Sequence, residues 1–91
     1  MKYLIQANDF AVIKRTDGSI FEEFINEIEV KARIARTDNF IIDYGYRVFP
    51  RNDKEKTFED FELLEVWTRQ GLTTYKKVFE KTDDGYEYCI K

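Results

Sequence analysis

Apolar residues near the start of the chain are spaced as in an amphipathic helix. The positions that share one face at 3.6 residues per turn are Ile20, Phe21, Phe24, Ile25 and Ile28. Ser19 and Glu22 before and within this run form the spacing of a helix-capping box. The pattern therefore predicts one α-helix over about 20–27.

After the predicted helix the period changes to two. Apolar and polar residues alternate over 28–35 and again over 40–49, which is typical of strands with one buried face. The short connection between them predicts an antiparallel hairpin. Further apolar runs bounded by turn residues predict strands over 2–6, 10–15, 63–69, 72–81 and 86–90, the last three as a meander.

These elements predict the fold class α+β. We expect residues 1–91 to form a single compact domain, because 91 residues is the length of one domain. Its antiparallel sheet is expected to have about five to seven strands in hairpins and a meander, with the helix over about 20–27 packed on one face. The aromatic content, 16% of the residues, also favours strands.

The composition removes most catalytic chemistry. The chain has no histidine and one cysteine, Cys89, so it lacks the commonest general base and the paired thiolates of a zinc site. We therefore predict a protein that is not an enzyme and has no metal or cofactor. A distant alternative is a metal-dependent nuclease, in which Asp17 and Glu29 hold the metal and Lys31 lies beside the phosphate.

Two features predict a cytoplasmic location. The chain has no apolar stretch long enough for a signal peptide or a membrane span. A single cysteine cannot form an intrachain disulfide, which fits an intracellular protein. If the chain is encoded by a phage, the expected location is the host cytoplasm.

Alternation along the strands predicts which side chains face a partner. The residues expected to face the helix are Val30, Ala32, Ile34, Ile42, Tyr44, Tyr46, Val48, Leu64 and Val66. The opposite face then carries Arg33, Arg47, Trp67 and Arg69. Arginine and tryptophan are enriched at binding hot spots, so we predict that these four residues form a partner-binding site.

A second predicted surface is acidic. Its members lie in the charged stretch around the start of the last three strands and are Asp53, Glu55, Glu59, Asp60 and Glu62. Carboxylates gathered in this way suit a basic partner, because complementary charge raises association rate and selectivity.

A small, acidic, aromatic-rich and histidine-free domain resembles the accessory proteins of phages and mobile elements. The resemblance is one of composition and rests on no motif. It implies a protein-binding inhibitor that docks on a host nucleic-acid-handling defence complex, which is our first functional hypothesis. The alternative is a small nucleic-acid-binding domain that uses the arginine–tryptophan face. Pairing of two copies through an edge strand is a further expectation about partners.

Overall fold

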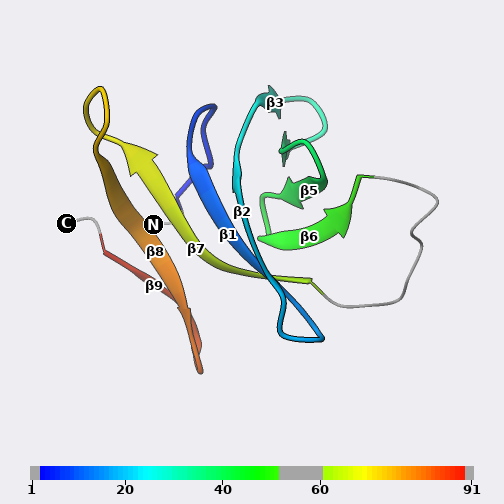
Figure 1. Cartoon of the computed structure of the whole chain (residues 1–91). Coiled ribbons are helices and arrows are strands. Elements are labelled where there is room, and N and C mark those ends of the chain that lie inside the picture. Colours follow the sequence, from blue (N-terminus) through cyan, green and yellow to red (C-terminus); the bar gives the residue numbers. More distant parts are fainter. Residues whose placement is uncertain (1–2, 52–60, 90–91) are drawn as a thin grey trace.

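The computed structural model describes residues 3–51 and 61–89, and these form an antiparallel β structure without a helix (Figure 1). The described strands are β1 (Phe10–Arg15), β2 (Ile20–Phe24), β3 (Glu27–Glu29), β4 (Ile34–Arg36), β5 (Phe40–Asp43), β6 (Arg47–Pro50), β7 (Phe61–Arg69), β8 (Tyr75–Thr82) and β9 (Gly85–Tyr88).

The sheet is curled, and a short connection joins β2 and β3, the two ends of its strand path. The order is β2-β1-β7-β6-β5-β4-β3, with β8 bonded to β7 and β9 to β8. Two residues join β2 to β3: the amide of Ile25 donates to Asp9 O beside β1, and that of Asn26 donates to Arg36 O in β4. The chain therefore changes neighbours within two residues, and the sheet forms a curled half-barrel (Figure 1).

Strand β7 connects the two parts of the sheet. One edge of β7 pairs with β1. The other edge pairs with β6 at Phe61 and Glu62 and with β8 from Glu65 to Arg69. The register shifts between Val12 and Ile13 in the β1–β7 ladder and between Val66 and Trp67 in the β7–β8 ladder. Such irregularities bend and twist a strand, which helps the sheet to curl.

The core fills the concave side of the curled sheet. Its buried apolar residues are Ile5, Ala11, Ile13, Ile25, Ala35, Phe40, Ile42, Tyr46, Val48, Leu63, Val66, Val78 and Phe79. The ring of Tyr46 stacks on that of Phe79, with centroids 4.5 Å apart. The partly buried Phe21, Ile28 and Tyr86 add side chains from β2, β3 and β9, so the core depends on the curl of the sheet rather than on a covering helix.

The predicted helix over about 20–27 is wrong, and with it the α+β class. Ile20–Phe24 is strand β2, paired antiparallel with β1. Phe21 packs against the core, as does the fully buried Ile25, whereas Ile20 and Phe24 point outward and are 51% and 54% exposed. The described part of the chain is all-β.

The turn before β2 explains the error. The Asp17 carboxylate accepts a hydrogen bond of 2.9 Å from Ser19 N, and Gly18 adopts a φ of 94°. Ser19 is therefore part of a tight β1–β2 hairpin and not a helix N-cap. The apolar pairs Ile20-Phe21 and Phe24-Ile25 have the spacing of one helix face. They fit a strand equally well, because adjacent residues of a strand point to opposite faces and each pair then supplies one inward and one outward side chain.

Two predicted strands are interrupted by turns. The run over 28–35 divides into β3 and β4 around a turn at Val30–Arg33, and the run over 40–49 divides into β5 and β6 around residues 44–46. The Asp43 carboxylate fixes the second turn by accepting hydrogen bonds from the backbone of Gly45 and Arg47. Residues 3–6, the described part of the first predicted strand, belong to no strand.

These turns reset the alternation, so the predicted core is right only in part. Ile42, Tyr46, Val48 and Val66 are buried as predicted. Residues expected in the core but found at most partly buried are Val30, Ala32, Ile34, Tyr44 and Leu64. Ala35 and Leu63 take the buried positions next to Ile34 and Leu64. The predicted meander of the last three strands is confirmed, since β7 pairs with β8 and β8 with β9.

Candidate functional site

The four predicted binding residues do not form one patch. Trp67 and Arg69 lie two residues apart on β7. Arg47 is paired with Glu62, five residues or roughly 16 Å along β7 from Trp67. Arg33 lies in the β3–β4 turn, and β4 is three strands from β7 along the sheet path. That any of the four binds a partner stays a prediction.

Two of the three arginines hold turns of their own chain. Arg47 Nε donates to Asp43 Oδ2 at 2.9 Å, so this guanidinium holds the β5–β6 turn. Burial alone raises the pKa of the Asp43 carboxyl, but hydrogen bonds from Arg47 and Gly45 outweigh it and hold that pKa below its ordinary value. Arg69 caps the β7–β8 turn by donating to the carbonyl oxygens of Gly71 and Leu72, at 2.8 and 2.9 Å.

Trp67 belongs to a group of aromatic side chains on the outer side of the sheet. Phe24 is paired with Phe10 and Phe10 with Trp67, so these residues of β2, β1 and β7 share a face. The Tyr75 ring, from β8, lies 6.3 Å from Phe10 and 5.9 Å from Phe24 between centroids. The Phe10 and Phe24 rings meet edge to face at 5.2 Å. We call Phe10, Phe24, Trp67 and Tyr75 the aromatic face.

Carboxylates lie beside the aromatic face in the next row across the sheet. Glu22 and Glu65 are both paired with Val12, and Glu65 is paired in turn with Glu80. Lys77 offsets part of this charge: its Nζ is 2.9 Å from Glu80 Oε2 and 3.9 Å from Glu65 Oε2. We call Glu22, Glu65 and Glu80 the acidic row.

The tryptophan is held by this neighbouring row. Its Nε1 donates to Glu65 Oε1 at 3.1 Å, and Lys77 Nζ lies 5.8 Å from the centre of its ring. The hydrogen bond that Lys77 donates to Glu80, the largest contribution, raises the pKa of Lys77 above its ordinary value, so the ammonium stays charged. Trp67 therefore presents a fixed, half-buried ring to the outside, which lowers the entropy lost on binding.

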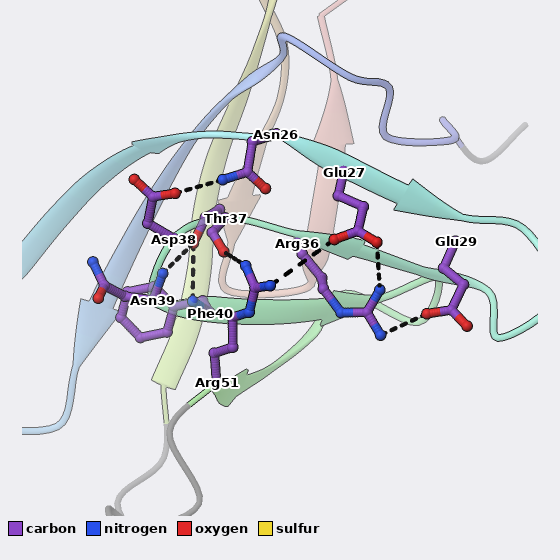
Figure 2. A network of polar contacts seen from close by, with 9 residues as sticks. All are labelled: Asn26, Glu27, Glu29, Arg36, Thr37, Asp38, Asn39, Phe40 and Arg51. Atoms are coloured by element: carbon purple, nitrogen blue, oxygen red, sulfur yellow. Dashed lines mark hydrogen bonds and ion pairs between the residues drawn. The ribbon is translucent and has the colours of Figure 1, made fainter.

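A network of polar contacts fixes the strands that follow β2 (Figure 2). Asn26, between β2 and β3, donates to Asp38 in the β4–β5 turn at 2.5 Å. Arg36 contacts the carboxylates of Glu27 and Glu29, at 3.3 and 2.5 Å. Arg51 donates to the carbonyl oxygen of Thr37, a residue with no exposed surface. These contacts hold β3, β4 and the β4–β5 turn in place, which is a structural role.

Of the predicted acidic surface only Glu62 can be placed. Asp53, Glu55, Glu59 and Asp60 lie outside the described residues. Glu62 faces outward on β7 and accepts a hydrogen bond of 2.6 Å from Lys81 Nζ. That bond holds the pKa of the Glu62 carboxyl below its ordinary value. The proposed role of this surface stays a prediction.

Three further features concern metal ligands, membrane-spanning helices and an edge strand of the sheet. Within residues 3–51 and 61–89, no group of three or more His, Cys, Asp or Glu side chains is placed to hold a metal ion. In the same ranges no helix is long and apolar enough to cross a membrane. Among the described strands β9 pairs with β8 alone, so pairing of two copies through its edge stays a prediction.

Comparison with protein-family models, curated proteins and solved structures finds no match to this chain. Sequence reasoning did not place Phe10, Phe24 and Tyr75 on the same face as Trp67, because it puts Phe24 on a buried helix face. The available signal was the Asp17-Gly18 pair between two apolar runs, which is typical of a hairpin.

Proposed function

We propose that the domain is a non-enzymatic protein-binding module that uses the aromatic face and the acidic row. The observation that carries the proposal is the gathering of four aromatic side chains, from four strands, on the side away from the core. Phe24 is 54% exposed although it contacts Phe10 and Tyr75. Exposed apolar clusters rimmed by polar residues are typical of interaction sites, and tryptophan and tyrosine are enriched at hot spots.

The acidic row favours a partner with basic and apolar side chains. Within the acidic row, three carboxylates meet the one ammonium of Lys77, which leaves the row itself negative. Proteins that handle nucleic acids carry lysine and arginine where they contact phosphates. A domain of this kind suits an inhibitor that covers such a surface on a host defence complex, in the host cytoplasm if the chain is phage-encoded. Direct nucleic-acid binding is less favoured, because the same carboxylates repel phosphate.

The test compares two serine substitutions on β2. Phe24 and Ile20 face outward from the same strand with similar exposure, but only Phe24 belongs to the aromatic face. In affinity capture from host extract, we expect Phe24→Ser to lose the partner and Ile20→Ser to retain it. With the purified partner, Phe24→Ser should weaken the dissociation constant roughly thirtyfold, the effect of removing a hot spot worth about 2 kcal/mol. Equal losses in both variants contradict the proposal.

A salt titration distinguishes the nucleic-acid alternative. We expect no saturable binding of a single-stranded oligonucleotide at physiological salt. Binding that falls steeply with added salt, and that Trp67→Ala abolishes in a folded protein, favours the alternative, because phosphate contacts release counterions.

A further inference from the structure

Arg33 has an unfavourable backbone conformation and no compensating side-chain contact. Three described residues other than glycine have a positive φ: Asn8 at 72°, Arg33 at 55° and Tyr46 at 65°. Asparagine tolerates this region, and the Tyr46 side chain is buried and hydrogen-bonded to Tyr3 O at 2.6 Å. Arg33 is exposed, and within the described residues its guanidinium makes no hydrogen bond or ion pair.

The turn itself does not require arginine. Arg33 N donates to Val30 O, and Arg33 O accepts from Tyr44 N, both at 3.2 Å. These contacts use backbone atoms that every residue has, and glycine or asparagine would form them with less strain. A long charged side chain at such a position, without a hydrogen bond or ion pair to the described residues, points to use outside the fold.

The residues around Arg33 break a second local rule. Arg33 lines an open groove of about 770 Å³ together with Leu4, Val30, Ala32, Asp43, Tyr44 and Gly45. Val30, in the turn, is 75% exposed, and Leu4, in an irregular segment, is 57% exposed. Turns and irregular segments usually expose polar residues. The groove thus combines aliphatic side chains with an unpaired guanidinium.

The charge of the groove defines what it accepts. Asp43 also lines it, but its carboxylate is occupied by the Arg47 side chain and by the backbone amides of Gly45 and Arg47, at 2.8 to 2.9 Å. Arg33 is left as the group able to pair with a ligand charge. Arginine binds carboxylates through a two-pronged, charge-assisted contact.

We propose that this groove binds a segment of a partner polypeptide in which aliphatic side chains adjoin a carboxylate. The carboxylate pairs with Arg33, and the aliphatic side chains cover Leu4 and Val30. This site goes beyond the proposed function, since it shares no residue with the aromatic face and takes a ligand of opposite charge.

The probe is a fluorescein-labelled hexapeptide of alternating leucine and glutamate, followed by fluorescence anisotropy with the full chain. The test variant is Arg33→Asn, because asparagine removes the charge and suits a positive φ. Lys31→Asn is the matched control: it removes the same charge from the same turn, but Lys31 does not line the groove. We expect Arg33→Asn to weaken binding about tenfold and Lys31→Asn less than about twofold.

A second readout separates binding from folding. The denaturation midpoint of Arg33→Asn should equal or exceed that of the wild type, so that binding falls while stability does not. Val30→Ser should also weaken the probe, and Phe24→Ser should leave it unchanged, which keeps this test independent of the aromatic face.

Several outcomes overturn the proposal. The first is that the probe shows no binding below about 1 mM, an affinity too weak for a specific site. The second is that Arg33→Asn and Lys31→Asn lose equal affinity. The third is that a hexapeptide of alternating leucine and lysine binds as tightly as the probe. A dimer in sedimentation that Arg33→Asn dissociates would assign the groove to a second copy of the chain, and would equally overturn it.

Discussion

At the scale of single residues, buried polar groups define how the chain can turn. Thr37 has no exposed surface, yet its hydroxyl donates to Glu23 Oε1 at 2.5 Å and accepts from Phe40 N at 2.9 Å. The same Glu23 carboxylate accepts from the Asn39 side chain at 2.8 Å. One hydroxyl therefore joins β2 to the β4–β5 turn.

Replacing Thr37 with valine should be costly although the volume is nearly kept. Thr37→Val leaves the buried Phe40 amide without its acceptor, and we expect the free energy of unfolding to fall by about 1–3 kcal/mol. A urea titration measures the loss. Thr37→Ser retains the hydroxyl and should lose less than Thr37→Val. If serine is the more damaging substitution, the methyl group and not the hydroxyl is what matters here.

At the scale of elements, β2 is decided by its neighbours. Its residues fit a helix and a strand about equally by spacing, but β1 offers a paired edge and the outer side of the sheet offers aromatic contacts. A hairpin requires only the tight turn at Asp17-Gly18, whereas a helix would leave Phe24 without these contacts. Tertiary pairing commonly overrides local preference in this way.

The strand assignment makes a prediction that a helix does not. Phe21 and Phe24 lie on one face of a helix, but on opposite faces of β2. Phe21 meets the Phe40 ring at 5.3 Å beside the core, while Phe24 is mostly outside. We therefore expect Phe21→Ala to cost about 2–4 kcal/mol and Phe24→Ala about 1 kcal/mol. Denaturant titration of the two variants measures the difference, and similar losses would contradict the faces assigned.

At the scale of the whole molecule, partly buried tyrosines from both ends of the described chain bond to other segments. Tyr3, near the N-terminus, donates to Asp9 Oδ2 at 2.8 Å, and Tyr86, in β9, donates to Leu63 O in β7 at 3.0 Å. Burial, with a smaller contribution from Asp9, raises the pKa of Tyr3 to about 12, against an opposing hydrogen bond from Thr68. Burial likewise raises the pKa values of Tyr46 and Tyr86.

These shifts predict that the domain loses stability in alkali. An unfolded tyrosine ionises near pH 10, before the folded Tyr3, so the unfolded state releases its proton first. The contribution of Tyr3 is therefore complete below about pH 10 and is lost as the pH rises through about 12. In thermal unfolding measured from about pH 8 upward, the midpoint should hold to about pH 10 and then fall, and it should fall less steeply in Tyr3→Phe. An identical decline in that variant would mean that other groups control it.

The sequence by itself determined the antiparallel character of the sheet, the C-terminal meander and the burial of Ile42, Tyr46, Val48 and Val66. Period-two alternation and turn residues are local signals, and they suffice where a strand runs without interruption. The tertiary structure alone decided that β2 is a strand, that turns divide two predicted strands, and that Trp67 joins Phe10 and Phe24 and not Arg33. Which strands become neighbours depends on closing the sheet over a shared core, and that pairing is a property of the whole chain and of no single segment.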